Sequence, residues 1–178
     1  TTTLAASLIC LETGRELASA GRLNPQVDYG HDVLTRIQRA SSTEGLELLA
    51  SAVQTAIRDM VREICEQAGA QPMEILDGVI GGNTTMVQIC AREDPSPLGQ
   101  LPFTVGLASG CSHPASRFGL GIHPQGTAYV PPILHAFVGS DISAGLVAVQ
   151  GFFGAGDKIL FLDVGTNGEM GVSTGRVR

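Results

Sequence analysis

The chain has 178 residues, of which 43% are hydrophobic and 16% charged, so it is long enough for one globular domain with a substantial core. Its formal net charge is −6 and its Lys and Arg residues form no block, which argues against a nucleic-acid backbone as a partner. No apolar run reaches the length of a membrane span and no signal peptide is visible, so we expect a cytoplasmic protein without a membrane partner.

The cysteines are widely separated and none forms a C-x-x-C pair. We therefore expect free thiols rather than a disulfide framework or a cysteine-held cluster within this chain. Cys111 and the four His residues match no zinc-site spacing, and we expect these histidines in loops or at the surface.

The first part of the chain predicts two strands followed by two helices. A turn at Gly14 favours a β-hairpin, and Asn24-Pro25 then interrupts the chain. Apolar residues recur every three or four positions in the longer helix, which Thr43 can cap and Gly69 can end. Asp32 is expected in the first turn of the shorter helix, where the helix dipole favours negative charge. The expected bounds are 2–11 and 16–23 for the strands and 31–40 and 44–68 for the helices.

The rest of the chain alternates short apolar strands with helices, apart from an irregular stretch rich in Gly, Pro, Ser and His. The resulting order, β-β-α-α-β-α-β-α-β-β, predicts an α/β fold with a mixed sheet, antiparallel at its start and fed later by crossover helices. The expected elements are strand 74–80, helix 84–92, irregular segment 93–127, a strand within 127–138, helix 143–153 and strands 158–164 and 169–174.

The motif most indicative of chemistry is Asp163-Val-Gly-Thr-Asn-Gly-Glu169, which follows a strongly apolar strand. An aspartate at the end of a strand can hold Mg²⁺, directly or through water. Gly165, Thr166 and Gly168 let backbone N–H groups approach a phosphate closely. Asn167-Gly168 is also a strong hairpin signal, and the two interpretations are compatible because a phosphate-binding hairpin needs the same turn.

A second motif, Gly81-Gly82-Asn83-Thr84-Thr85-Met86, lies between a predicted strand and a predicted helix. The first N–H groups of that helix can face an anion, and Thr84 or Thr85 can cap the helix or donate a hydrogen bond. Taken alone, an ordinary strand-to-helix turn with a threonine cap explains these residues equally well.

A third motif, Gly139-Ser140-Asp141, stands where a predicted strand leads into a helix. Asp141 can orient a water for attack on a phosphate, as a general base. Taken alone, an aspartate favoured by the helix dipole is the better interpretation.

In this order, the three motifs resemble the actin-like superfamily of sugar kinases, acetate kinase and large heat-shock chaperones. A closer resemblance is to the C-terminal region of the reductive activators of corrinoid proteins, and it covers nearly the whole chain. The most specific strings are Gly82-Asn-Thr-Thr-Met86 and Asp163-Val-Gly-Thr-Asn-Gly-Glu169. The supporting strings are Thr1-Thr2-Thr3, Asn24-Pro25-Gln26, Tyr29-Gly30, Asp32-Val33, Arg36-Ile37 and Phe137-Val138-Gly139-Ser140-Asp141.

The resemblance implies an RNase H-like lobe over residues 1–153 and a phosphate-type hairpin over 158–178 that begins a second lobe. It implies an ATP-dependent activator that returns Co(II) corrinoid proteins to Co(I), with ATP and Mg²⁺ as ligands and a corrinoid protein as partner. A [2Fe–2S] ferredoxin domain supplies the electron in that family, and we expect it outside this chain. Within the first lobe the expected parts are a hairpin at 1–23, helices and insertion loops at 24–127, and a strand with the linking helix at 128–153.

By the same resemblance, Asp163 would hold Mg²⁺ and Asp141 would help to orient the attacking water. The family has an Asp-x-Gly before the threonine run, and this chain starts too late to include it. The residues implied in nucleotide and phosphate binding are Thr1, Thr2, Thr3, Gly82, Asn83, Thr84, Thr85, Gly165, Thr166, Asn167 and Gly168.

The chain begins without Met and stops soon after the second hairpin begins, so we expect a fragment that binds nucleotide weakly or not at all alone. The apolar strand from Lys158 would lack partners in such a fragment. We expect it to pair with the fragment's own sheet edge or with a second copy, since an exposed apolar edge invites pairing.

Two other classes stay open. Another actin-like enzyme, such as a sugar kinase or an activator of a radical dehydratase, would share the phosphate motifs. The dehydratase activators normally carry a cysteine-held cluster between the lobes, which scattered cysteines do not suggest. A non-catalytic module that docks a corrinoid protein or associates with itself would need no nucleotide.

Overall fold

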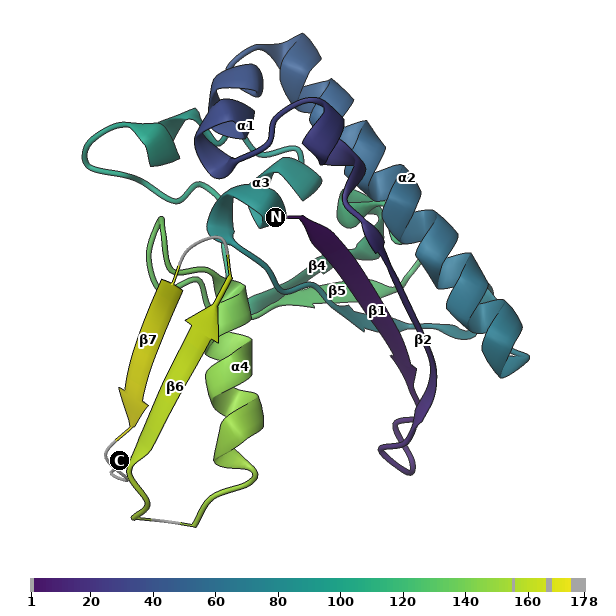
Figure 1. Ribbon diagram of the computed structural model, residues 1–178. Coiled ribbons are helices and arrows are strands. Elements are labelled where there is room, and N and C mark those ends of the chain that lie inside the picture. Colours follow the sequence, from purple (N-terminus) through teal and green to yellow (C-terminus); the bar gives the residue numbers. More distant parts are fainter. Residues whose placement is uncertain (1, 155, 166–167, 174–178) are drawn as a thin grey trace.

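The computed structural model describes residues 2–154, 156–165 and 168–173, which form an α/β fold with three separate sheets (Figure 1). A strand hairpin and a three-stranded sheet pack against one long helix, and a second hairpin lies beside another helix at the opposite side of the molecule. No helix among the described residues has the length and apolar composition that crossing a membrane requires.

Strands β1 (Thr3–Ile9) and β2 (Glu16–Leu23) form the predicted antiparallel hairpin. Residues of β1 alternate between half-buried and exposed, which is the pattern of a strand with one packed face. Gly14 turns the chain with a φ of +69°, a backbone conformation that favours glycine. The packed face of the hairpin lies against the long helix, where Ala18 is buried.

The 3-10 helix η1 (Pro25–Asp28) and helix α1 (Val33–Arg39) come next. Asp32 is the N-cap of α1 and accepts the Thr35 backbone N–H at 2.8 Å, so it precedes the first turn in which the sequence placed it. This hydrogen bond lowers the pKa of Asp32 below its usual range. The carboxylate therefore satisfies a helical N–H that would otherwise have no partner within the helix.

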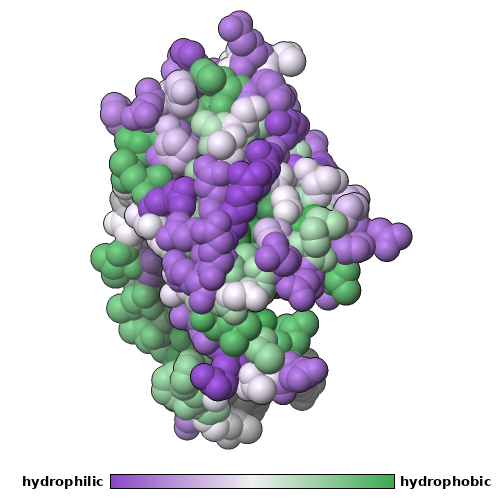
Figure 2. Space-filling view, turned by 90° about the vertical axis from the view of Figure 1, so that its right-hand side faces the viewer, coloured by the Kyte–Doolittle hydropathy of each residue, from purple (hydrophilic) through white to green (hydrophobic). Residues whose placement is uncertain are grey.

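Helix α2 (Thr43–Ala68) is the longest element. Its cap is Ser42, whose hydroxyl accepts the Gly45 N–H at 3.1 Å, so the prediction of Thr43 as the cap was wrong by one residue. Gly69 ends the helix in the left-handed conformation, as predicted. The polar side of α2 runs over the face seen in Figure 2. The predicted apolar side is buried at Leu49, Val53, Met60 and Ile64.

The central sheet has the order β3 (Asp77–Val79), β5 (Thr127–Val130) and β4 (Cys111–Pro114). Strand β5 is parallel to β3 and antiparallel to β4, so the predicted mixed sheet is confirmed here. Strand β5 ends at Pro131-Pro132, as expected. Strand β4 lies in the segment predicted to be irregular. The sequence did not indicate it, because its four residues, which include His113 and Pro114, show no strand-like alternation of apolar and polar side chains.

The predicted strand at 74–80 is shorter in the structure, because the 3-10 helix η2 (Pro72–Glu74) occupies its beginning. Helix α3 (Thr84–Cys90) follows β3 and is two residues shorter than predicted. Two further 3-10 helices, η3 (Ser96–Gly99) and η4 (Ala115–Phe118), lie within the segment predicted to be irregular.

Helix α4 (Ser140–Gln150) starts three residues before the predicted bound, so the third motif lies at its first turn. Strands β6 (Ile159–Val164) and β7 (Gly168–Ser173) form the predicted hairpin beside it. Phe161 of β6 packs on α4 at Gly145, where a Cβ would lie 2.8 Å from the phenyl ring.

One buried cluster joins α2 to β1 and to the central sheet, although β1 and the sheet are not hydrogen-bonded to each other in the part that the structure describes. The sequence order had suggested that the first hairpin belongs to the mixed sheet, and the structure separates the two. The cluster includes Val53 and Ile57 of α2, Leu4 of β1, and Ala128 and Val130 of β5.

The thiols differ in their predicted reactivity. Burial raises the pKa of Cys90 to about 12, whereas a hydrogen bond with the Thr13 side chain lowers the pKa of the half-buried Cys10. At pH 8 only about one Cys90 in ten thousand would be a thiolate, which is the reactive form. Iodoacetamide at pH 8 should therefore alkylate Cys10 at least about a hundred times faster than Cys90, as measured by peptide mass spectrometry. Equal rates in the folded protein would contradict this, and urea should make the two thiols react alike.

Candidate functional site

The sheet topology brings two of the three motifs together. Strands β3 and β5 are parallel neighbours, so the loops that follow them leave the sheet at the same edge. The loop after β3 leads through Gly82 into α3, and the loop after β5 leads through Gly139 into α4. Ligands of open α/β sheets commonly bind beyond the carboxyl ends of parallel strands, which makes this edge the candidate site.

The two loops are hydrogen-bonded through Gly82 and Ser140. The Ser140 N–H donates to the Gly82 carbonyl at 3.0 Å, and the Ser140 hydroxyl accepts the Gly82 N–H at 3.1 Å. The Asp141 N–H also points at the Gly82 carbonyl, at 3.4 Å. At Gly139 a Cβ would overlap the Gly82 carbonyl oxygen and lie 2.8 Å from the Cα of Asn83. Glycine is therefore needed at 139 because the loops approach so closely.

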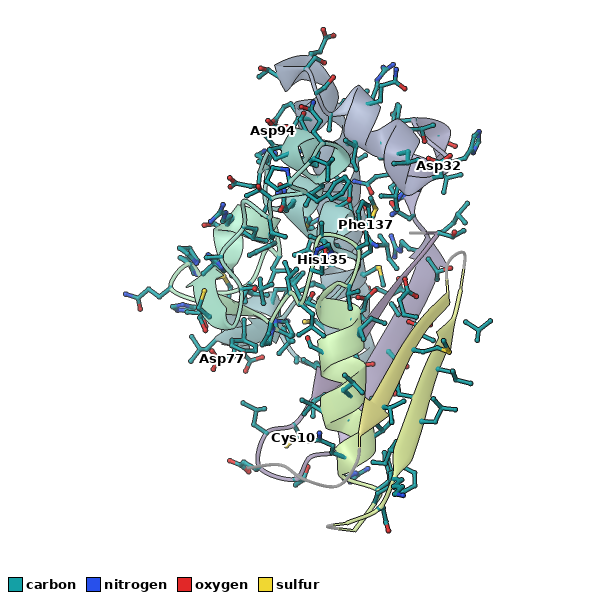
Figure 3. The ribbon with its side chains drawn as sticks, turned by 90° about the vertical axis from the view of Figure 1, so that its left-hand side faces the viewer. Cys10, Asp32, Asp77, Asp94, His135 and Phe137 are labelled. Atoms are coloured by element: carbon teal, nitrogen blue, oxygen red, sulfur yellow. The ribbon has the colours of Figure 1, made fainter. Side chains whose placement is uncertain are left out.

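The side chains of the second motif hold this loop in place. Asn83, rather than a threonine, caps α3 and accepts the Thr85 N–H at 3.0 Å. Thr84 and Thr85 are buried, and the Thr84 hydroxyl donates to the His135 carbonyl at 2.9 Å. Figure 3 shows His135 and Phe137 at the N-terminal end of α4. The Thr84 bond is thus a second tie between the loop before α3 and the loop before α4.

Asp141 is exposed in the first turn of α4. One of its carboxylate oxygens accepts the Ile142 N–H at 3.0 Å. The first three N–H groups of α4 are therefore engaged within the protein, two by Gly82 and one by Asp141 itself. An incoming anion would meet the Asp141 side chain rather than open N–H groups at this helix.

The remaining motif, Asp163–Glu169, lies on the β6–β7 hairpin. Asp163 is half-buried in β6 and pairs with Glu169 of β7, while Gly165 and Gly168 are exposed. Thr166 and Asn167 lie outside the described residues. The register of the two strands confirms the predicted hairpin.

The start of β1 is the fourth segment that carries residues implied by the resemblance. Thr2 and Thr3 are exposed, and Thr1 lies outside the described residues. In Figures 1 and 3 the start of β1, the N-terminal ends of α3 and α4 and the turned end of β6–β7 lie toward the same region of the molecule. The residues implied by the resemblance that the structure describes therefore come from four segments that lie toward one region.

Cys111 and three other side chains, none of them in the three motifs, form a local chain of polar contacts. The Cys111 thiol lies 3.6 Å from Nε2 of His113, and Nδ1 of His113 lies 3.4 Å from Arg117. Arg117 in turn donates to Glu93 at 2.7 Å. No group of three or more His, Cys, Asp or Glu side chains with the arrangement of metal ligands occurs within residues 2–154, 156–165 and 168–173.

Sequence reasoning missed the role of a buried polar cluster behind α3. The fully buried Arg36 donates to the Gly30 carbonyl at 2.8 Å and contacts the sulfur of Met86 at 2.8 Å. Gln26, also fully buried, donates to the Leu49 carbonyl at 2.9 Å. The strings Asn24-Pro25-Gln26 and Arg36-Ile37 thus contribute buried polar side chains that pack against α3 through the contact of Arg36 with Met86. A buried arginine cannot be told from an exposed helical arginine by periodicity alone, which is why the sequence did not reveal it.

Two surface hollows lie elsewhere, with volumes of about 620 and 530 Å³. Tyr29 and Leu48 contribute to both, between η1, α1 and α2. Neither hollow contains a residue of the three motifs, and we place the candidate site at the sheet edge because two of the three motifs are hydrogen-bonded to each other there.

Comparison with known proteins decides the family. The model of the RACo middle region matches residues 1–151. The chain belongs to this family. The chain is similar to a curated relative, the corrinoid activation enzyme RamQ of Eubacterium limosum, with 31% identity over 175 residues, which are 97% of this chain and 29% of RamQ.

A solved structure agrees with this assignment. A reductive activator for corrinoid, iron–sulfur protein is similar over 97% of this chain and 28% of its own, with 32% identity and a TM-score of 0.89. The predicted resemblance to reductive activators of corrinoid proteins is therefore confirmed. The chain spans less than a third of the length of the two relatives.

The close approach at Gly139 predicts a position-specific effect on stability. Gly139→Ala should lower the free energy of unfolding by about 1–3 kcal/mol, because the new methyl group overlaps backbone that cannot move away. Gly151, at the other end of α4, is the matched control: its Cβ would meet only an ordinary contact at 3.5 Å. Gly151→Ala should be neutral or stabilise by about 0.4–1 kcal/mol. Urea unfolding of both variants measures this, and an equal effect at the two positions would refute the close approach.

Proposed function

We propose that this chain is part of an ATP-dependent reductive activator that returns a corrinoid protein from Co(II) to Co(I). The observation that carries the proposal is the likeness to a solved reductive activator over 97% of the chain, at 32% identity and a TM-score of 0.89. The corrinoid protein is then the partner, and ATP is the second substrate. Such a reaction belongs in the cytoplasm, where we place the protein.

The reduction is uphill from ordinary electron donors, and ATP binding and hydrolysis would supply the missing free energy. The electron would come from a [2Fe–2S] group, and the residues of this chain do not fit one. Cys65 and Cys90 are buried on α2 and α3, while Cys10 and Cys111 lie half-buried on other segments. We therefore place the [2Fe–2S] group outside this chain and derive no step through it.

Two carboxylates, Asp141 beyond the sheet edge and Asp163 on β6, are of the kind that suits a site for phosphate with Mg²⁺. Mg²⁺ usually takes one or two carboxylates from the protein and completes its shell with waters and phosphate oxygens. Asp163, half-buried at the end of β6, is such a carboxylate, and we assign it to Mg²⁺. The exposed carboxylate of Asp141 is held by the Ile142 N–H and would orient the attacking water.

Phosphate contacts fall on the turns rather than on the start of α4, because the first N–H groups of that helix are already bonded. We assign the contacts to the backbone around Gly165, Thr166, Asn167 and Gly168, where glycines permit close approach. Thr1, Thr2 and Thr3 would face the same phosphates from the start of β1. Gly82 and Asn83 would contribute backbone, while the buried Thr84 and Thr85 would shape the loop from within.

The proposal includes the division of the chain into two parts. Residues 1–153 would be the first lobe of an RNase H-like, actin-like fold, and 158–178 the beginning of a second lobe. The family match ends at residue 151, just after α4, which supports a boundary there. The face of β6–β7 turned away from α4 is apolar, and a second lobe or a second copy would cover it. Its exposed residues are Leu160, Leu162, Val164, Met170 and Val172.

The covering of this face is testable by substitution. Leu162→Glu should leave the stability of residues 1–178 within about 0.5 kcal/mol, because Leu162 is 53% exposed there. In the full-length gene product it should cost about 2 kcal/mol or more, because the same side chain would be buried. Leu11→Glu is the control, since Leu11 is 85% exposed in the β1–β2 turn. Equal effects in the two lengths would argue against a second lobe, and loss of a dimer of residues 1–178 would favour pairing between copies.

The nucleotide site is tested by removing its carboxylate. Asp163→Ala in the full-length gene product should weaken Mg-ATP binding about a hundredfold or more and abolish Co(I) formation on the corrinoid protein. Calorimetry measures the first, and the absorbance of the corrinoid measures the second. Asp157→Ala is the control, because this exposed carboxylate precedes the same strand and accepts the N–H of nearby Gly154 at 2.8 Å. If Asp163→Ala leaves Mg-ATP binding unchanged, the motif is a structural turn without a role in nucleotide binding. That outcome would favour a docking module that binds the corrinoid protein without nucleotide.

A further inference from the structure

We propose that Ser140 is a positioning residue for Asp141, acting through its hydrogen bonds with Gly82. This rests on the proposed function, because it gives Ser140 a part in the same site. Ser140 is fully buried, whereas the neighbouring Asp141 is exposed. One residue thus anchors the first turn of α4 from inside while the next presents its carboxylate outside.

The hydroxyl of Ser140 contacts both polar backbone groups of a single residue. It accepts the Gly82 N–H at 3.1 Å and lies 3.2 Å from the Gly82 carbonyl oxygen, to which it can donate. The Ser140 N–H reaches the same carbonyl at 3.0 Å. A single hydrogen bond leaves one segment free to pivot on the other, whereas bonds to the N–H and the C=O together restrict that rotation.

These contacts differ from ordinary helix capping. A capping serine stands just before the first helical residue and accepts an N–H from its own helix. Ser140 is the first residue of α4, after Gly139, and its hydroxyl bonds a loop 58 positions earlier. Its partner therefore lies in another motif of the proposed site.

Asp141 depends on the same acceptor. Its N–H lies 3.4 Å from the Gly82 carbonyl, so the backbone of Ser140 and the backbone of Asp141 are both held by the same carbonyl group. If the Ser140 hydroxyl is removed, the Gly82 N–H loses its acceptor and the loop can shift relative to α4. The distance from Asp141 to a phosphate held by the other segments would then vary.

The first experiment tests the contact itself, without activity. Ser140→Ala should raise amide hydrogen exchange in the peptide that contains Gly82 by about tenfold or more, because that N–H loses its bond. Exchange in α2 should not change, which shows that the fold is kept. Ser143→Ala is the matched control: its hydroxyl, one turn along, donates to the Ser140 carbonyl at 3.1 Å within the same helix. That variant should leave the Gly82 peptide unchanged.

The second experiment tests the role in the reaction, by a double-mutant cycle in the full-length gene product. Ser140→Ala should lower kcat for ATP hydrolysis by about tenfold or more, since small displacements of a reacting group cost up to roughly a hundredfold. On an Asp141→Asn background the same change should cost less than about twofold, because the group that Ser140 positions no longer acts. Ser143→Ala should change neither rate.

The outcomes separate the two proposals. Equal losses on the two backgrounds, or unchanged exchange at Gly82, would overturn the positioning role while leaving the ATPase intact. A wild-type protein that hydrolyses no ATP would overturn the proposed function, and the positioning role with it. If Ser140→Ala does not fold, Ser140→Cys takes its place; a thiol is a weak acceptor and should give intermediate effects in the two experiments.

Discussion

The apolar side of α2 is the constraint on which the rest of the fold depends. It is the surface that the β1–β2 hairpin and the central sheet share, since these two sheets have no hydrogen bonds to each other in the described chain. A two-stranded hairpin and a three-stranded sheet of short strands are marginal alone in water. Burying their inner faces against Val53 and Ile57 of one helix places them in a common core and so fixes where the sheet edge lies.

The site follows from that edge. Parallel pairing of β3 with β5 sends two loops out side by side, and glycine at 139 lets their backbones meet. The ties are polar and specific: Ser140 with Gly82, and Thr84 with the His135 carbonyl. Because the two ties cross between the same loops, α3 and α4 start from one connected structure rather than from two independent turns.

This arrangement also changes how the motifs would act. A helix start preceded by glycine suggests open N–H groups for an anion, yet the first N–H groups of α4 are bonded within the protein. The available chemistry at that helix is the Asp141 carboxylate, which suits the orientation of water better than the binding of phosphate. Under the proposed function, phosphate would then bind at the β6–β7 hairpin and Mg²⁺ at Asp163 on its first strand. The proposed site would therefore take one carboxylate from α4 and one from β6.

The sequence by itself determined the features that act over a few residues. The period of α2, its end at Gly69, and the two hairpins could be predicted because periodicity and turn conformation are local properties. The motifs could be picked out, but their partners could not. That Ser140 bonds Gly82 and that β4 pairs with β5 depend on segments tens of residues apart. Such contacts leave no periodic signal, because they arise only when burial against α2 and parallel strand pairing have brought distant loops to the same edge.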